Sequence, residues 1–392
     1  MKVLALGGCG QQGRRAVKAL LQSSDISQII VADINLDAAQ EFVCELEDSR
    51  VISMRIDVLN RSQLLEVMGG VDVVANFVGP FFRYAEIVVS AAIDAKVNYV
   101  DICDDTAPTL AIMDKYSSRA EAAGITVLMG MGASPGLLNV FARYAADQMD
   151  SVEDIRLFWN VSVNDIETDL SETADNAAIF EHGIEIIAGD VPQFIDGKLC
   201  QVPGGSGMKE VDFPHLGRQR VYFVAHPETV TLPRYIKAKN ITNRGGVLGM
   251  DDLLLGMKEL GLTDHSEMTL KGQVVQAADV GMAVMANLAE KSPPLSEDIA
   301  PVCSDSFVEV RGLRNGESIQ IHISHRSENG FPRMDEGTGI SAAIGVLMVA
   351  RGEVTRVGVH APEGCVEPTC FFAQLKFYGM SVVERRCEVR RL

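Results

Sequence analysis

The segment from Lys2 to Gly13, KVLALGGCGQQG, decides the fold of this chain. An apolar run that is typical of a buried strand leads into three glycines, Gly8, Gly10 and Gly13. In such a turn Gly8 permits the tight bend, Gly10 lets the backbone approach a pyrophosphate, and Gly13 lets the following helix pack closely on the strand. The segment therefore predicts a strand, a glycine turn and a helix that together bind a dinucleotide.

Two further features refine this prediction. Gln11 and Gln12 open the helix, whose free backbone N–H groups and partial positive charge favour phosphate. Asp33 ends the second predicted strand, about 20 residues past the last glycine, where a carboxylate accepts hydrogen bonds from the adenosine ribose. Because a carboxylate repels a 2′-phosphate and no Arg follows Asp33 directly, the sequence favours NAD over NADP. The alternative is an ordinary glycine turn beside a surface aspartate.

The first third of the chain alternates between apolar, strand-like runs and helical stretches of about 10 to 15 residues. Such alternation predicts βαβ units, and six strands make a complete doubly wound parallel sheet of the Rossmann type. The predicted strands are Lys2–Gly7, Gln28–Asp33, Val51–Asp57, Asp72–Phe77, Asn98–Ile102 and Ile125–Gly130.

The pattern changes after Gly136. Residues 154–163 alternate between apolar and polar, as do later runs at 219–225 and 306–325, and helical stretches lie between them. We expect an α+β domain built on a mainly antiparallel sheet, a kind of sheet that commonly lines a substrate cleft. The predicted fold class is therefore α/β, with an N-terminal Rossmann sheet and a second, α+β domain.

The composition excludes several classes of function. The chain has 392 residues, too many for one ordinary core, and a net charge of −18 that repels nucleic acid and anionic membrane surfaces. No run reaches the roughly 18 unbroken apolar residues of a membrane span, and Met1 leads directly into a strand, so we expect a cytoplasmic protein without a membrane partner. The cysteine pair Cys365 and Cys370 has no His at ligand spacing, so we expect reduced thiols and no metal site.

Two strand ends are expected to border the cofactor. Asp57 and Val58 close the third strand, where they either flank the adenine or serve as an ordinary helix N-cap. Asn76, Gly79 and Pro80 follow the fourth strand, whose carboxyl end faces the crevice in a doubly wound sheet. We expect these three residues to border the nicotinamide half of the cofactor, with a plain turn as the alternative.

Three carboxylates follow the fifth strand, at Asp101, Asp104 and Asp105. A neighbouring like charge and partial burial raise the pKa of such a group, which prepares it as a general acid or base. Asp101 and Asp104 are therefore candidates for catalysis or for binding a substrate amine. In the alternative interpretation Asp105 caps the next helix and Asp104 is solvated.

Three further residues are candidates for substrate binding. Ser134 and Pro135 follow the sixth strand and predict a helix start aimed at the crevice, where Ser134 either binds a substrate carboxylate or only caps the helix. Arg234 is suited to clamp a carboxylate with two hydrogen bonds, and an exposed structural role is the alternative. His226 is a candidate proton relay, although a lone His is more often structural.

Several segments, in this order, resemble the saccharopine dehydrogenase/reductase-like family. They are GGCGQQGRRAV at 7–17, VDVVANFVGPF at 71–81, NYVDICDD at 98–105, AGITVLMGMGASPGLLN at 123–139, HPETVTLPR at 226–234 and GTGISAAIGVLMVARGEVTRVGVHAPEG at 337–364. The resemblance implies a Rossmann domain at 1–135, an α+β substrate and dimerisation domain at 136–338, and a segment at 339–392 that returns to the first domain.

The same resemblance implies a homodimer and an NAD(P)-dependent oxidation of an amine carbon, or the reverse reduction of an imine, in amino-acid or polyamine metabolism. Ser134 stands where saccharopine reductases carry Asp. This resembles the lysine-dehydrogenase-like or uncharacterised branches and argues against saccharopine itself as the substrate.

Together these predictions describe an NAD-dependent oxidoreductase that acts on the C–N bond of an amino acid or an amino-acid-derived secondary amine. A carboxylate near the reacting carbon suits this chemistry, because an iminium ion is positively charged. Two alternatives remain. A C=C or C=O reductase of the same family needs a Tyr or Lys proton donor at the crevice. An NAD-binding sensor or scaffold without catalysis predicts an acidic cluster that points to solvent.

Overall fold

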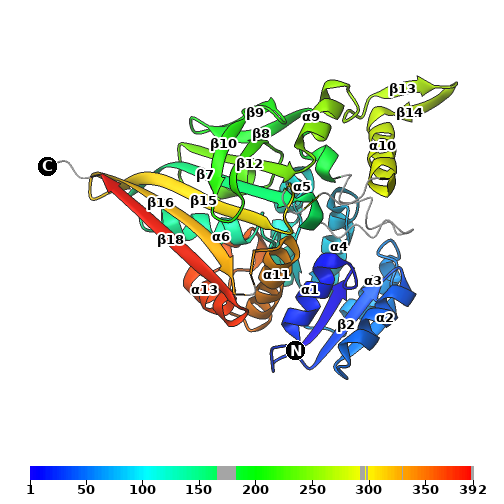
Figure 1. Ribbon diagram of the computed structural model, residues 1–392. Helices are drawn as coiled ribbons and strands as arrows, with labels where there is room; N and C mark the ends of the chain where they lie inside the picture. Colours follow the sequence, from blue (N-terminus) through cyan, green and yellow to red (C-terminus); the bar gives the residue numbers. More distant parts are fainter. Residues whose placement is uncertain (166–181, 292–295, 297–298, 329, 390–392) are drawn as a thin grey trace.

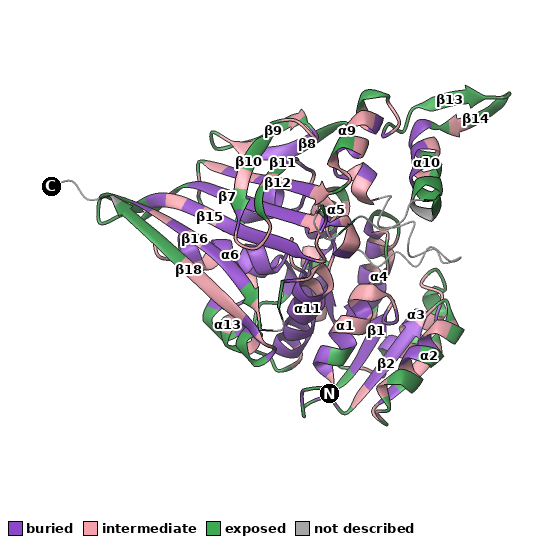
Figure 2. Ribbon diagram, viewed as in Figure 1, coloured by how far each residue is buried: buried purple, intermediate pink, exposed green. Residues whose placement is uncertain are grey.

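The computed structural model describes residues 1–165, 182–291, 296, 299–328 and 330–389. Two large sheets organise this part of the chain, one parallel and one mixed (Figure 1). Figure 2 shows that burial is greatest in the helix α11 and in the inner strands of both sheets, while the hairpin β13–β14 is exposed. The hydrophobic cores therefore lie between the sheets and the helices that pack on them.

Seven parallel strands form the first sheet, in the order β17-β6-β5-β4-β1-β2-β3. The six strands of the N-terminal third thus have the doubly wound order 3-2-1-4-5-6, which confirms the predicted Rossmann-type sheet. The seventh strand comes from the C-terminal segment, pairs with β6 and was not predicted. The strands are β1 (Lys2–Leu6), β2 (Gln28–Asp33), β3 (Val51–Arg55), β4 (Val73–Asn76), β5 (Asn98–Asp101), β6 (Thr126–Leu128) and β17 (Gly358–His360).

Helices bury both faces of this sheet, which explains why its central strands are apolar throughout. One face packs against α1, α2 and α11, and the other against α3, α4 and α5, while α6 packs mainly against the second sheet. Gly339 allows α11 to approach α1, because a Cβ at this position would lie 2.6 Å from the Cβ of Arg15. The helices are α1 (Gln11–Leu20), α2 (Leu36–Leu46), α3 (Arg61–Met68), α4 (Phe81–Ala95), α5 (Thr106–Ala123), α6 (Leu137–Ala146) and α11 (Met334–Ala350).

The second sheet has nine strands and is mainly antiparallel, as predicted. Its main path runs β10-β11-β12-β7-β15-β16-β18, and β8 joins it by pairing with β12 and β9. Only the β7–β12 pair is parallel among its strand pairs in the described residues. The strands are β7 (Ser151–Ser162), β8 (Asp190–Ile195), β9 (Lys198–Pro203), β10 (Lys209–Phe213), β11 (Gly217–Phe223), β12 (Asn240–Leu248), β15 (Ser304–Arg314), β16 (Glu317–Ser327) and β18 (Met380–Val389).

The C-terminal segment contributes to both sheets. Its helix α11 lies on α1, β17 extends the parallel sheet, and β18 pairs with β16 at the edge of the second sheet (Figure 1). The C-terminal segment therefore connects the two sheets. No helix in the described ranges is long and apolar enough to cross a bilayer.

The remaining elements are short or lie at the periphery. The β13–β14 hairpin projects beyond the second sheet next to α10 (Figure 1). These elements are the turn η1 (Val163–Asp165), α8 (Glu228–Thr231), the turn η2 (Leu232–Arg234), α9 (Asp251–Glu259), β13 (Glu267–Leu270), β14 (Gln273–Gln276), α10 (Ala277–Lys291), α12 (Pro362–Cys365) and α13 (Pro368–Phe377).

Candidate active site

The glycine turn between β1 and α1 has the features that a bound pyrophosphate requires. A Cβ at Gly13 would lie 2.5 Å from the carbonyl oxygen of Gly7, so glycine is needed for the helix to approach the strand. The N-cap Gly10 offers no side-chain hydrogen bond to the first turn of α1, which leaves N–H groups available. The Oε1 atoms of Gln11 and Gln12 are buried without a hydrogen-bond partner among the described residues. The uncapped N–H groups of α1 and these two polar atoms without a partner are suited to bind a pyridine dinucleotide.

The end of β2 is the expected position of the adenosine ribose. Asp33 is partly buried there, and its Oδ1 accepts a hydrogen bond of 3.0 Å from the N–H of Asn35. Arg55 is the register partner of Asp33 on β3 and is exposed. The prediction of NAD depended on the residue that directly follows Asp33, and this cation on the neighbouring strand was missed.

Asp57 and Val58 lie in the turn between β3 and α3. The carboxylate of Asp57 accepts a hydrogen bond of 2.9 Å from the N–H of Leu59. The N-cap of α3 is Asn60, whose side chain accepts from the N–H of Gln63. Asp57 is therefore not the helix cap that was considered as one alternative, and the adenine-flanking role stays a prediction.

A chain of buried hydrogen bonds joins the ends of β4, β5 and β6. The Nδ2 of Asn76 donates to the hydroxyl of Tyr99 over 2.9 Å, and that hydroxyl donates to Oδ2 of Asp101 over 2.9 Å. The Oδ1 of Asp101 accepts from the N–H groups of Cys103 and Gly130, at 3.1 and 2.7 Å. Asp101 thus holds together the strand ends on which the crevice is built.

Burial has a strong effect on Asp101, which is 1% exposed. Burial raises the pKa of Asp101 to about 6, although its three hydrogen bonds oppose the rise. Gly79 and Pro80 follow Asn76 and lead into α4, whose N-cap is Pro80. Asn76 and Asp101 both use their side chains inside the protein, so their expected contacts with ligands stay predictions.

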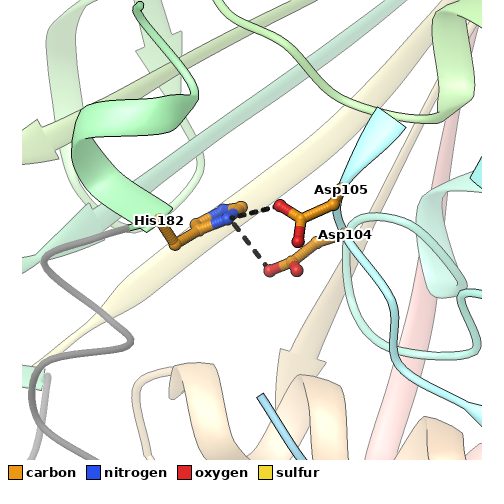
Figure 3. A group of neighbouring side chains, drawn as sticks. All are labelled: Asp104, Asp105 and His182. Atoms are coloured by element: carbon orange, nitrogen blue, oxygen red, sulfur yellow. Dashed lines mark ion pairs between the residues drawn. The ribbon is translucent and has the colours of Figure 1, made fainter. Parts of the chain in front are cut away.

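Asp104 and Asp105 meet His182, which lies in a short helical turn at 182–185 (Figure 3). The Nε2 of His182 lies 3.3 Å from Oδ2 of Asp104, and its Nδ1 lies 3.4 Å from Oδ1 of Asp105. Asp105 occupies the N-cap position of α5, yet its carboxylate accepts from the N–H of Phe82 and caps no N–H of its own helix. The acidic cluster is therefore paired with a histidine from the second domain.

The three groups influence each other's protonation. Burial and the charge of Asp105 raise the pKa of Asp104, against the opposing charge of His182. Burial also acts on Asp105, but the hydrogen bond and charge of His182 outweigh it and hold the pKa of Asp105 below its usual value. Burial lowers the pKa of His182, and the two carboxylates more than reverse this, to about 9. At neutral pH His182 is thus a cation, and Asp104 is the member of the carboxylate pair that takes up a proton more readily.

These three side chains also satisfy one requirement of a metal site. One ligand atom of each lies within 4.8 Å of the others. Because His182 already forms an ion pair with both carboxylates, we interpret the cluster as an acid–base group.

A second histidine, His226, borders this cluster. Its ring centroid lies 6.0 Å from that of His182 and 5.3 Å from the ring of Trp159. The Nδ1 of His226 is 3.0 Å from Oε2 of Glu228, a residue that is fully buried. The hydroxyl of Ser134 donates to the other oxygen of Glu228. The structure therefore brings Ser134 and His226 together through Glu228, and their roles in binding a substrate stay predictions.

The helix start predicted at Ser134 and Pro135 is wrong. The helix α6 begins at Leu137 and its N-cap is Gly136, which has a φ of +125°. A Cβ at Gly136 would lie 2.1 Å from the carbonyl oxygen of Gly132, so this close contact places the glycine at the cap. Ser134 is left in the loop before the helix, where its hydroxyl is free to reach Glu228.

The structure does not bring Arg234 into this cluster. Its guanidinium pairs with Asp114 on α5 over 2.9 Å, and the Asp114 side chain is 66% exposed. Sequence reasoning also missed His182, Glu228 and Trp159. Glu228 lies two residues after His226 in the HPETVTLPR segment, so an acid beside a candidate histidine was a visible signal. His182 and Trp159 carried no such signal, because only the fold brings them to the crevice.

Two family models match almost the whole chain. The saccharopine dehydrogenase NADP-binding domain matches residues 3–128, and the saccharopine dehydrogenase C-terminal domain matches residues 132–380. The described site lies where the two matched regions meet.

Three proteins illustrate what the chain is similar to. Carboxynorspermidine synthase of Vibrio cholerae is 24% identical over 97% of this chain and 96% of that protein. Carboxyaminopropylagmatine dehydrogenase of a Synechocystis strain is 22% identical over 96% of this chain and 95% of that protein. The solved structure of saccharopine dehydrogenase (L-Glu forming) from Saccharomyces cerevisiae has a TM-score of 0.71 at 16% identity, covers 98% of this chain and 99% of that chain, and shows a shared fold.

Proposed function

Since this chain belongs to the saccharopine dehydrogenase family, we infer that it is a pyridine-nucleotide oxidoreductase that acts on the C–N bond of an amino-acid-derived secondary amine. One observation carries this inference. The Asp104–Asp105–His182 cluster lies at the carboxyl ends of the parallel strands, the edge of a doubly wound sheet where the cofactor binds. An anionic group at this edge favours the positive charge of an iminium ion.

The cofactor supplies hydride transfer when it is bound, and the protein contributes position and charge. Gly8, Gly10, Gly13 and the start of α1 hold the pyrophosphate in this proposal, and Asp33 holds the adenosine ribose. Asp104 binds and orients the substrate amine, since its carboxylate lies at this edge of the sheet beside His182.

The names of the relatives suggest the class of substrate. Both describe a carboxylated amine, norspermidine in one and aminopropylagmatine in the other. We propose that the product here is likewise a secondary amine with a carboxylate on one side and a cationic amine chain on the other. The acidic residues Asp104 and Asp105 support recognition of a cationic chain.

We propose NAD as the cofactor, because Asp33 repels a 2′-phosphate. Arg55 favours the second possibility, NADP, because an exposed guanidinium opposite Asp33 is suited to bind that phosphate. We further propose a cytoplasmic homodimer, as the family resemblance implies.

The catalytic role is favoured over an NAD-binding sensor. A sensor predicts an acidic cluster that points to solvent, whereas the Asp105 side chain is 13% exposed and pairs with His182. A C=C or C=O reductase needs a tyrosine or lysine donor at the crevice. Tyr99 is fully buried, and its hydroxyl is engaged between Asn76 and Asp101.

The experiment that tests the proposal follows NADH and NADPH oxidation with pairs of an amino-acid semialdehyde or keto acid and an amine, including diamines and agmatine. We expect turnover with at least one carbonyl–amine pair and none with the carbonyl compound alone. Tight NADH binding without turnover on any pair would favour the sensor instead. Turnover with the carbonyl compound alone would favour the C=O reductase.

A further inference from the structure

A buried trio next to the Asp104–Asp105–His182 cluster consists of Glu228, His226 and Ser134. Glu228 opens α8 and is 0% exposed, and His226 is 3% exposed. The carboxylate uses one oxygen for His226 Nδ1, at 3.0 Å, and the other for the hydroxyl of Ser134. Ser134 comes from the loop between β6 and α6, and all three residues lie within the second matched region, 132–380.

The carboxylate of Glu228 is ionised at neutral pH. Burial raises the pKa of Glu228, but the charge and hydrogen bond of His226 and the hydrogen bond of Ser134 outweigh it and hold the pKa below its usual value. An ionised carboxylate only accepts hydrogen bonds. The partner nitrogen of His226 must therefore carry a proton, which makes Nδ1 the donor and leaves Nε2 as the basic nitrogen of the neutral ring.

The ring of His226 is also fixed by its other neighbours. It lies against Trp159, whose indole N–H donates to Oδ1 of Asn243 over 2.9 Å and is thereby locked in place. It borders the ring of His182, which pairs with the acidic cluster. A histidine held at one nitrogen by a carboxylate and placed at a reaction site is the usual arrangement of an oriented acid–base group.

We propose that Glu228 is a positioning residue: it holds His226 as the Nδ1–H tautomer, so that Nε2 exchanges a proton with the substrate nitrogen, and Ser134 fixes the orientation of Glu228. This proposal rests on the function proposed above. In the oxidative direction the N–H bond of the substrate ammonium breaks, its proton bonds to Nε2, and the electron pair stays on nitrogen. The hydride then leaves the adjacent carbon for the nicotinamide, which is reduced, and the carbon–nitrogen bond becomes an iminium. The reductive direction reverses these steps.

Several charged groups surround His226 and Glu228. Glu228 lies on α8, Asp104 and Asp105 on the β5–α5 loop, and His182 on the turn at 182–185. Glu363 on α12 lies close enough to Glu228 to feel its charge. This charge adds to the effect of burial in raising the pKa of Glu363 to about 7. The test must therefore separate the effect of Glu228 from that of the whole cluster.

The first test uses the resting protein and needs no substrate. Nitrogen-15 NMR of histidine-labelled protein, with the His226 signals assigned from a His226→Asn variant, is recorded from about pH 6 to about pH 10. We expect the neutral His226 ring to carry its proton on Nδ1. In Glu228→Gln this preference for Nδ1–H is lost, because a carboxamide can donate as well as accept. A neutral wild-type ring protonated at Nε2 would overturn the proposal.

The second test uses kinetics with whichever amine pair supports turnover. We expect Glu228→Gln to lower kcat about 100- to 10,000-fold with little change in KM, and to change the pH dependence of kcat. Glu228→Asp restores part of kcat, and Ser134→Ala causes a smaller loss. The control is Glu309→Gln, which removes a carboxylate paired with Arg156 on the second sheet and leaves kcat and the pH profile unchanged.

The kinetic results are different if Glu228 has only a structural role. In that case Glu228→Gln lowers the amount of folded enzyme, but the kcat of the folded fraction and its pH profile stay as in the wild type. If no amine pair supports turnover, the proposed function fails, and the NMR experiment still decides whether Glu228 fixes the tautomer of His226.

Discussion

His182 is the residue on which the charge balance of the crevice depends. Its two ring nitrogens face Asp104 and Asp105, and together these carboxylates raise its pKa to about 9 from the ordinary value of 6.5 (Figure 3). Because the folded state holds this proton more tightly than the unfolded state, the ion pairs stabilise the fold most below pH 6.5. That stabilisation is lost as the pH rises through about 9.

The loss of these ion pairs at high pH leads to a prediction about thermal stability. We expect the melting temperature of the wild type to fall between pH 6.5 and pH 9 by more than that of His182→Gln, which lacks the titrating group. The shift in the pKa of His182 limits the extra loss of unfolding free energy in the wild type to at most ~3 kcal/mol. Because the His182 side chain is partly exposed to solvent, the actual loss is smaller. Scanning calorimetry of both proteins across this pH range measures the effect. Parallel pH dependences for the two proteins would show that the pairs of His182 do not form in solution.

Asp33 is expected to set the choice of cofactor. Replacing it by Ser removes the charge that repels a 2′-phosphate and leaves the exposed Arg55 on the neighbouring strand. We expect kcat/KM with NADPH relative to NADH to rise about 10-fold or more in Asp33→Ser, which corresponds to about 1.4 kcal/mol. The matched control is Asp37→Ser, in the first turn of α2, which keeps the wild-type ratio. A wild-type enzyme that already prefers NADPH would show that Arg55 dominates and that the NAD prediction is wrong.

Strand β5 connects the neighbouring segments that bear the site residues. Asp101 at its end connects β4 through Tyr99 and Asn76, and it connects the loop after β6 through the N–H of Gly130. A short strand with one fully bonded carboxylate therefore fixes three loops that bear site residues.

This connection predicts a contrast between two substitutions. Asp101→Ala leaves the buried N–H groups of Cys103 and Gly130 without an acceptor, and we expect a loss of about 2 to 4 kcal/mol in the free energy of unfolding. Asp101→Asn keeps an acceptor oxygen for both groups and costs less. Urea denaturation of the two variants at pH 7 compares them. Equal losses would mean that the charge of Asp101, rather than its hydrogen bonds, stabilises the strand ends.

Local sequence patterns predicted the elements that depend on local physics. The glycine turn, the doubly wound strands and the alternation of the second sheet follow from residue spacing alone. The start of α6 did not follow, because Ser134 and Pro135 look like a helix start while the contact between Gly136 and Gly132 moves it to Leu137. Strand β17 was missed as well, since three residues, Gly358–His360, carry too little periodicity to reveal a partner as distant in sequence as β6.

The part of the site that lies on one short segment was predictable from the sequence. The acids at the end of β5 lie on one short segment, and the sequence displayed them together. His182, Trp159 and Glu228 reach the crevice from the second domain, where their positions depend on the long-range pairing of β7 with β12 and β15. The domain limits at 135 and 338 stay a prediction, and the C-terminal segment crosses between both sheets.

For the whole molecule, charge and fold point to the same kind of substrate. A net charge of −18 attracts cationic amines and raises their concentration near an acidic crevice. The parallel sheet supplies the nucleotide-binding edge, and the second domain contributes the histidines that face it. The central claim is therefore that hydride passes between the nicotinamide and a carbon bonded to nitrogen.

Isotope transfer tests this claim most directly. The protein is incubated with the active carbonyl–amine pair and NADH or NADPH deuterated at both C4 positions, and the product is analysed by mass spectrometry and NMR. We expect a secondary amine that carries one deuterium, on the carbon of the new C–N bond. Deuterium in an alcohol or on a carbon remote from nitrogen would contradict it.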